Sequence, residues 1–324
     1  MKRLISLLLC ALLIIPALAE DAPDFEPIPW DIKFPPTLPN PDCYLPNNGV
    51  YHDDSIDIQI NVTYWTQDLQ QVDAPGEGTT TVMSARVKLT DVSQFRTGFA
   101  NKYPSKQARH VNDMTKRFNA VMGIDGDYCL YHEQGIVVRN GQTRRMRPHK
   151  GRDELIVDEN GDFHLITRTT QAKWDEYIAG GGTVLHAFCF GPALVVDGVP
   201  LTNLDDVTID NGKAKKAQRM VIGQIGKLEY LILTNEGPES TAPKSVGFDL
   251  VQMANLCVQF GLNNAYNLDG GSSSTIALNN QKINSPSSHK NRMVGDCIWF
   301  ATLVKEETWR EKESVQTVEV EENK

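Results

Sequence analysis

Two-residue turn signals recur between short runs of β-forming residues, and this pattern constrains the fold of the chain more than any other feature. Asparagine or aspartate followed by glycine adopts the backbone conformation that joins two adjacent antiparallel strands. The pattern predicts hairpin turns at Asn140-Gly141, Asn160-Gly161 and Asp197-Gly198, near Gly226, and at Asn279-Asn280. We therefore expect an α+β fold, with a mixed, antiparallel-rich sheet and packed helices, and not a doubly wound parallel sheet.

Two strands and three helices are predicted around these hairpins. Residues 55–60 alternate between apolar and polar side chains, as in a half-buried strand, and residues 81–89 form a second strand. The predicted helices are Lys106–Phe118, Thr170–Ala179 and Asp249–Phe260. The last is the clearest, because Asp249 can cap it and Gln252, three residues later, completes a capping box.

The chain divides by composition into one main domain and two flanking segments. Its 324 residues are 40% hydrophobic, enough for a full-sized core. We assign residues 49–305 to a single main domain, residues 20–48 to a proline-rich N-terminal segment, and residues 306–324 to an acidic C-terminal tail.

The net charge of the chain is -9, which argues against a nucleic-acid partner because phosphate backbones require a basic face. One local run is strongly basic, Arg144-Arg145-Met146-Arg147. We interpret this run as a solvated charged hairpin, with a contact to an anion as the alternative.

The N-terminus has the pattern of a secretory signal peptide at residues 1–19. Lys2 and Arg3 give a positive start, residues 4–15 are apolar, and Ala17-Leu18-Ala19 resembles a cleavage site. The apolar stretch is short for a membrane span. We therefore expect a secreted, extracytoplasmic protein whose mature form has no membrane span.

Five cysteines would remain after cleavage, and none has the spacing of a zinc site. Most of them lie in apolar runs, where a cysteine packs as a small buried hydrophobe. Packing in the core is the favoured interpretation, and one disulfide is the alternative. The cysteines are Cys43, Cys129, Cys189, Cys257 and Cys297.

A loop rich in glycine and hydroxyl groups is predicted after the short apolar run Ala265-Tyr266, which ends a strand. It reads Asn267-Leu268-Asp269-Gly270-Gly271-Ser272-Ser273-Ser274-Thr275. The two glycines allow a ligand to approach the backbone amides closely, and the aspartate adds a charge or a metal ligand. This composition suits a ligand with sugar or phosphate oxygens.

The run from Asn264 to Thr275 resembles the signature of the phosphodiester glycosidase (NAGPA-like) family, which includes N-acetylglucosamine-1-phosphodiester alpha-N-acetylglucosaminidase. The resemblance covers roughly residues 50 to 305. At residues 235–238 the chain has Asn-Glu-Gly-Pro, where many members carry Asp-Gly-Arg. Other blocks of the family occur in the same order: Ile124-Asp125-Gly126-Asp127-Tyr128, residues 135–141, residues 190–195, residues 219–223, and Arg292 with Asp296 before the last strand.

The resemblance implies hydrolysis of a sugar from a sugar-1-phosphodiester, and it implies roles for residues in the motif positions. An oxocarbenium-like transition state requires a carboxylate, and a phosphate requires a guanidinium or free amides. Asp125-Gly126-Asp127 could instead be a tight turn. The expected catalytic residues are Asp269, Asp125 and Arg219, and the expected substrate-binding residues are Asn267, Gly270, Gly271, Ser272, Ser273, Arg292 and Asp127.

Two questions stay open at this level. Asp269, Asp125 and Asn267 are oxygen ligands suited to calcium or magnesium, although no EF-hand spacing is present and no cofactor is certain. The resemblance implies a glycan or sugar-phosphodiester partner. Two hypotheses stay open for the chain: an enzyme acting on an envelope glycan or exopolysaccharide, and a non-catalytic glycan-binding module. The altered block at residues 235–238 favours the binding module, whereas Asp269, Arg219 and Arg292 favour the enzyme.

Overall fold

The computed structural model describes the protein over residues 37–45, 49–204, 207, 215–238, 240, 244–284 and 291–310. The predicted signal peptide lies outside these residues, and so does the acidic tail beyond residue 310. Of the proline-rich segment, only residues 37–45 are described. Nothing that is described is a helix of the length and apolarity needed to cross a bilayer.

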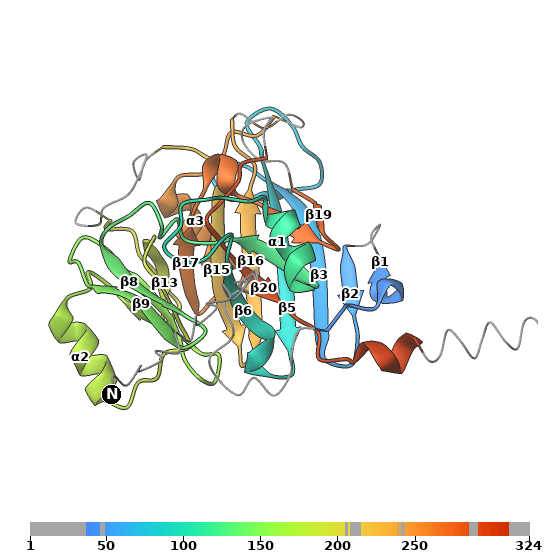
Figure 1. Ribbon diagram of the computed structural model, residues 1–324. Helices are drawn as coiled ribbons and strands as arrows, with labels where there is room; N and C mark the ends of the chain where they lie inside the picture. Colours follow the sequence, from blue (N-terminus) through green and yellow to red (C-terminus); the bar gives the residue numbers. More distant parts are fainter. Residues whose placement is uncertain are drawn as a thin grey trace, which may run out of the picture.

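The described strands form three sheets, and every pairing between them is antiparallel (Figure 1). The large sheet has the order β1(Tyr44–Leu45), β2(Val50–His52), β3(Ile56–Trp65), β5(Thr80–Leu89), β16(Glu229–Asn235), β15(Arg219–Gly226), β17(Asn264–Leu268), β13(Ala193–Val196) and β14(Val199–Pro200), with β4(Gln71–Val72) beside β3.

Two smaller sheets pack against the large one. The first, called here the β8 sheet, has the order β11(Phe163–Ile166), β10(Glu154–Val157), β12(His186–Phe188), β8(Gly135–Arg139) and β9(Gln142–Arg147). The second, called here the β7 sheet, has the order β19(Gln281–Lys282), β18(Ile276–Leu278), β7(Met122–Asp125), β20(Asp296–Phe300) and β6(Phe95–Phe99).

One hydrophobic core joins the three sheets. Ile222 and Leu268 of the large sheet, Ile298 of the β7 sheet and Leu155 of the β8 sheet all belong to the same buried cluster. Consecutive residues of β15 face opposite sides of the sheet. Ile222 packs in this core, whereas Val221 packs in a second buried cluster with the helix at residues 250–259. Strands buried on both faces read as continuous apolar runs, which is why alternation is weak in this part of the sequence.

Helices cover the outer faces of the sheets. α3(Leu250–Gln259) packs on the large sheet, α1(Val111–Phe118) on the β7 sheet, and α2(Gln171–Ala179) on the β8 sheet through Trp174 (Figure 1). The molecule is thus predominantly β, with its helices outside. The antiparallel prediction is confirmed, but the strands form three sheets and not one mixed sheet.

Local signals predicted most of the elements correctly. All five hairpin turns are present, and Asn140 and Gly141 have the positive φ values of 50° and 74° that their turn requires. Asp249 caps α3 in a capping box with Gln252, and Thr170 caps α2. The strand predicted at residues 55–60 is longer than expected, since β3 continues to Trp65.

The helix predicted from Lys106 begins only at Val111, so the prediction was wrong for its first five residues. The reason is a distant strand-like contact: the amide of Arg109 donates to the carbonyl of Val294 at 3.0 Å, and the amide of Val294 donates back at 2.8 Å. These bonds hold residue 109 in extended geometry.

The cysteine prediction is confirmed in its favoured form. Cys129, Cys189, Cys257 and Cys297 are buried, and Cys43 is partly buried. All five thiols are free in the structure.

Candidate active site

The large sheet and the β7 sheet meet where β17 ends, and backbone hydrogen bonds join them there. The amide of Asp269 donates to the carbonyl of Gly126 at 3.2 Å, and the amide of Gly126 donates to the carbonyl of Asp296 at 3.0 Å. The amide of Thr275 donates to Oδ1 of Asp125 at 2.8 Å. The loop that follows β17 is therefore fixed against the ends of β7 and β20.

Glycine is required at two of these positions because the backbones approach closely. A Cβ on Gly270 would lie 2.9 Å from the carbonyl oxygen of Gln218. A Cβ on Gly126 would lie 2.4 Å from Cγ of Asp296. The glycines thus allow the tight contacts that bring Asp269, Asp125 and Asp296 together.

These three aspartates form a buried carboxyl cluster, and burial is the largest cause that raises each of their pKa values. Burial, and next the charge of Asp269, hold the pKa of Asp125 well above its usual range. Burial, and next the charge of Asp127, raise the pKa of Asp296 to about 7. Burial raises the pKa of Asp269 to about 6, against the opposing effects of the Ser273 hydroxyl and the Arg292 charge. At neutral pH, Asp269 is thus mostly ionised.

Arg139, from β8, lies buried between Asp127 and Asp296. Its Nη2 donates to Oδ1 of Asp127 at 2.8 Å and to Oδ2 of Asp296 at 2.9 Å. Its guanidinium also lies 4.3 Å from the ring centre of Phe188. A buried guanidinium needs such partners to offset the cost of leaving water. Arg139 therefore fixes the position of the Asp296 carboxyl.

Asp127 is saturated with hydrogen bonds. Besides Arg139, the amide of Cys129 donates to its Oδ1 at 3.1 Å, and the amide of Cys189 donates to its Oδ2 at 2.8 Å. Burial raises the pKa of Asp127, but Arg139 and the Cys189 amide outweigh burial and hold the pKa below its ordinary value. Asp127 thus holds Arg139 and the neighbouring loop, and both of its carboxylate oxygens are engaged.

Several polar atoms around the cluster are buried and form no hydrogen bond with the described residues. They belong to side chains that are 2% exposed or less. Buried polar atoms in proteins almost always have partners, so a group of exceptions points to a ligand. The atoms are Oδ2 of Asp125, Oδ1 of Asn267, Oγ of Ser274 and Oγ1 of Thr275.

Arg292 supplies an exposed positive charge beside the cluster. Its charge lowers the pKa of Asp269, and its guanidinium lies 5.3 Å from the ring centre of Tyr128. Its Nη2 also donates to the Tyr128 hydroxyl at 3.4 Å. A guanidinium in this position can meet a phosphate oxygen next to Asp269.

Arg219, which the sequence placed with this group, has other contacts. Its Nη2 donates to the carbonyl of Lys215 at 2.6 Å, and its Nε donates to the carbonyl of Phe248 at 3.4 Å. Burial lowers its pKa to about 10, and the nearby carboxylate that opposes this shift is Asp249, not Asp269. These contacts of Arg219 hold β15 against the start of α3, and its catalytic role stays a prediction.

The remaining predicted residues lie in or beside the loop. Gly270, Gly271 and Ser272 are partly exposed, and the 3-10 helix Gly271–Ser273 (η4) carries the chain past Asp269. The amide of Gly271 donates to the carbonyl of Gln218 at 2.9 Å, so that amide is engaged within the fold. Asn267 anchors the loop, since its Nδ2 donates to the carbonyl of Gly191 at 2.8 Å.

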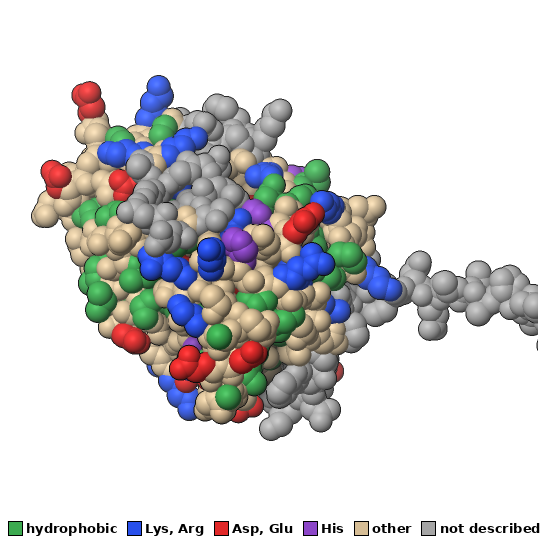
Figure 2. Space-filling model, turned by 90° about the vertical axis from the view of Figure 1, so that its left-hand side faces the viewer, with side chains coloured by type: hydrophobic (Ala, Val, Ile, Leu, Met, Phe, Trp, Pro, Cys, Tyr) green, Lys and Arg blue, Asp and Glu red, His purple; other side chains and the backbone are tan. Residues whose placement is uncertain are grey.

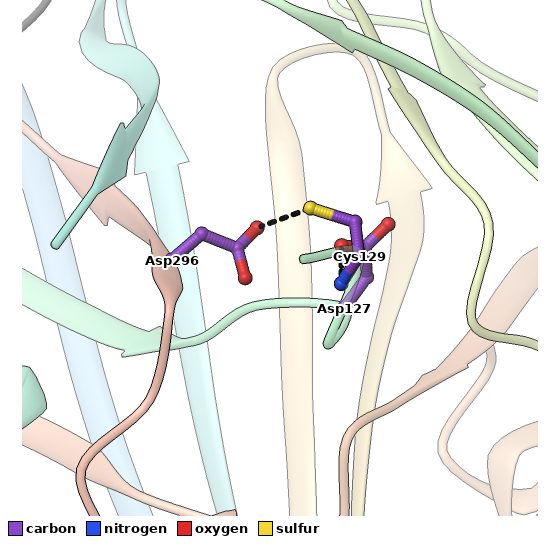
Figure 3. A group of neighbouring side chains, drawn as sticks. All are labelled: Asp127, Cys129 and Asp296. Carbon is purple, nitrogen blue, oxygen red and sulfur yellow. Dashed lines mark hydrogen bonds between the residues drawn. The ribbon is translucent and has the colours of Figure 1, made fainter. Parts of the chain in front are cut away.

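The acidic group with the closest spacing for a cation is Asp127, Cys129 and Asp296, whose ligand atoms lie within 4.8 Å of one another (Figure 3). Sγ of Cys129 lies 3.8 Å from Oδ2 of Asp296. The Arg139 guanidinium already contacts both carboxylates, and its Nη2 lies 3.7 Å from Sγ of Cys129. The positive charge of Arg139 thus neutralises the two carboxylates among these three side chains, as a bound metal ion would.

Sequence reasoning did not assign Arg139 or Asp296 to the site. Both stand within blocks that carried the family resemblance, and this was the available signal. Arg139 ends an apolar strand and Asp296 begins another. A charged residue in such a buried position needs a partner of opposite charge. Pairing of the two across 157 positions was not visible in the sequence.

Comparisons with known proteins show which family and fold the chain resembles. No curated protein sequence matches the chain. Among solved structures, the catalytic domain of zebrafish N-acetylglucosamine-1-phosphodiester alpha-N-acetylglucosaminidase, auto-inhibited by its pro-peptide, is similar with a TM-score of 0.60 and 14% identity, over 82% of this chain and 87% of that chain. A hypothetical protein from Synechocystis is similar with a TM-score of 0.51 and 13% identity, over 77% of this chain and 62% of that chain.

At such identities the structural likeness shows the fold alone. The sequence model of the NAGPA family, described as phosphodiester glycosidase, matches residues 118–301, which is more than half of the chain. That range contains the carboxyl cluster, Arg139 and Arg292. The chain belongs to the phosphodiester glycosidase family.

Proposed function

We propose that this protein is a secreted hydrolase that releases a sugar from a sugar-1-phosphodiester of the N-acetylglucosamine-1-phosphodiester type, in an envelope glycan or exopolysaccharide. The observation that carries the proposal is the carboxyl cluster of Asp125, Asp269 and Asp296, with unpaired buried oxygens around it and the exposed Arg292 beside it. Family membership supports the reaction class.

The two ends of the substrate require different groups. The phosphodiester carries one negative charge, which the Arg292 guanidinium meets from the exposed side of the cluster. The sugar ring develops positive charge at its anomeric carbon as the bond to the phosphate oxygen breaks. The ionised Asp269, with its pKa of about 6, stabilises this charge at neutral pH.

The proposed reaction is hydrolysis at the anomeric carbon of the sugar. Water adds to the anomeric carbon, and the bond from this carbon to the phosphate oxygen breaks with its electron pair left on the phosphate. Asp269 accepts the proton of the attacking water. A phosphate leaving group needs little protonation, so Asp125 is not needed as a general acid, and its unpaired Oδ2 forms a hydrogen bond with a sugar hydroxyl.

Arg139 and Asp127 act through other residues. The pair holds Asp296 in place and does not need to touch the substrate. We therefore expect Arg139 to position the cluster, and Asp269 to perform the chemistry.

A binding module on the same scaffold is the second candidate, and the altered block at residues 235–238 favours it. In the structure Asn235 is fully buried, and its Nδ2 donates to the carbonyls of Ala217 and Glu236, each at 2.8 Å. The Asn235 amide group thus holds the end of β16. Turnover is the property that separates the two candidates.

The test is release of N-acetylglucosamine from its methyl 1-phosphodiester, measured for the wild type, for Asp269→Asn and for a control. Asp197→Asn is a matched control, because Asp197 is an exposed turn residue and asparagine suits its φ of 49°. We expect Asp269→Asn to lower kcat by about 10² to 10⁴, the usual range for a general acid or base. Asp197→Asn should match the wild type. Wild-type protein that binds the compound without turnover would establish the binding module instead.

A further inference from the structure

A pocket of about 450 Å³ adjoins the carboxyl cluster, and its walls are basic. Figure 2 looks onto the side of the molecule where β8 and β9 lie in Figure 1, and lysine and arginine side chains gather there around histidines. The pocket walls contain a single acidic side chain, Glu133. The basic side chains of the walls are Lys106, Arg144, Arg145 and Arg147, with His132 among them.

One residue separates this pocket from the carboxyl cluster. Cys129 lines the pocket, while its Sγ lies 3.8 Å from Oδ2 of Asp296 and its amide donates to Asp127. Arg145 fixes this shared wall, since its Nη1 donates to the carbonyl of Cys129 at 2.8 Å. Cys129 thus lies between the pocket and Asp296 of the carboxyl cluster.

Aromatic rings extend the same surface from Arg292 to the pocket. The rings of Tyr128 and Tyr131 stack with their centres 4.5 Å apart. Arg292 lies over the Tyr128 ring at 5.3 Å, and Nζ of Lys106 lies over the Tyr131 ring at 6.0 Å. Positive charges thus stand at both ends of one stacked pair, the first beside Asp269 and the second in the pocket.

The basic side chains of the pocket do more than prevent the edge strand β9 from pairing with other chains. β9 is the outer strand of the β8 sheet, and charged residues on such a strand prevent pairing with other chains. Edge protection does not require Lys106, which comes from a separate segment and faces the same space. In a chain with a net charge of -9, cations that converge from two segments on one pocket select for an anion.

We propose that this pocket binds a second anionic group of the substrate, carried on the part that stays attached to the phosphate after cleavage. The inference rests on the proposed function. An N-acetylated sugar is neutral, so the released sugar gains nothing from these cations, whereas a glycan bearing a phosphate or carboxylate does. The substrate class is therefore a polyanionic glycan or a similarly charged phosphodiester.

The experiment compares three N-acetylglucosamine 1-phosphodiesters, whose second alcohol is methanol, glycerol 3-phosphate or glyceric acid. The wild type should have about tenfold higher kcat/KM for one or both charged compounds than for the methyl compound, the equivalent of one charge-assisted contact. The gain should lie in KM and should shrink as salt is added. The preferred compound tells phosphate from carboxylate.

The variant Lys106→Gln/Arg147→Gln should bring the ratio of charged to methyl substrate close to one. Lys227→Gln is the matched control, because Lys227 is exposed at the turn that follows Gly226, the opposite end of β15 from Gln218 and the cluster. It should retain the wild-type ratio. Equal kcat/KM for the three compounds in the wild type, or a ratio that survives in the double variant, would overturn the inference while the proposed function stood.

If none of the compounds is cleaved, the pocket is tested by calorimetry, which measures the affinity of the protein for glycerol bisphosphate. The double variant should then bind it several-fold more weakly than the wild type, and Lys227→Gln should bind it normally. This outcome would support the basic pocket even though the proposed hydrolase activity had failed. Equal binding by the wild type and the double variant would refute the pocket.

Discussion

At the scale of single residues, the carboxyl cluster lowers the free energy of unfolding, because its carboxyl groups are buried away from water. A dry carboxylate is costly unless it is paired, and Asp269 and Asp125 have raised pKa values because their pairing is incomplete. Asp127, by contrast, is fully paired and has a lowered pKa. Substitution by asparagine should therefore have opposite effects at Asp269 and Asp127.

Asp269→Asn should be more stable than the wild type at neutral pH. The pKa of Asp269 is raised from 3.8 to about 6 on folding, so its contribution to stability is fully present below pH 4 and is lost as the pH rises through 6. Asparagine does not ionise and avoids this loss. We expect a gain of about 3 kcal/mol in the free energy of unfolding above pH 7, which vanishes near pH 4. Urea unfolding across this pH range measures it.

Asp127→Asn is the contrasting variant in the same experiment. It leaves the Arg139 guanidinium buried with a weakened partner, so we expect a loss of about 3 kcal/mol or more. A destabilised Asp269→Asn at pH 7 would show that Asp269 is held by its neighbours as tightly as Asp127, and the account of the cluster would be wrong.

The sequence could supply part of this site. Asp269, Asp125 and Arg292 were predicted from motif blocks, as was Asn267. In the structure the charge of Asp269 acts on Asp125, and the charge of Arg292 acts on Asp269. Their roles stay predictions. Arg219 stands in a motif block as well, but its donors bind backbone carbonyls of residues that only the fold places beside it. A motif gives the type of side chain, whereas the use of its hydrogen bonds depends on distant neighbours.

At the scale of elements, local chemistry determined what could be predicted. Turn pairs and helix caps act within four residues of the chain, so the hairpins and α3 were predicted correctly. The start of α1 was not, because the bridge between Arg109 and Val294 joins positions 185 residues apart. The close approach of Gly126 to Asp296 is a contact of the same long-range kind.

Gly126→Ala tests whether that approach matters for function. The new Cβ would lie 2.4 Å from Cγ of Asp296, so the carboxyl must move away from Arg139. We expect at least a tenfold fall in kcat for sugar release, because small displacements of reacting groups cost large factors. Gly226→Ala is the control, since a Cβ on Gly226 meets nothing within 4 Å. Full activity in Gly126→Ala would mean that the position of Asp296 is irrelevant to turnover.

At the scale of the whole molecule, the candidate site lies where three sheets meet. Asp269 follows β17 of the large sheet, Asp125 and Asp296 belong to the β7 sheet, and Arg139 belongs to the β8 sheet (Figure 1). The common core sets how the sheets face one another. The sequence showed antiparallel hairpins but not their division into three sheets, because side-chain packing between distant strands decides it.

The central claim is that this arrangement breaks the bond at the anomeric carbon and not the bond at phosphorus. Hydrolysis of an N-acetylglucosamine 1-phosphodiester in water labelled with heavy oxygen tests this most directly, with mass analysis of both products. The account predicts that the label appears in the released sugar and that Asp269→Asn slows its incorporation by the same factor as it lowers kcat. Label in the phosphate product would contradict the account, because the carboxyl cluster would then be serving a phosphodiesterase.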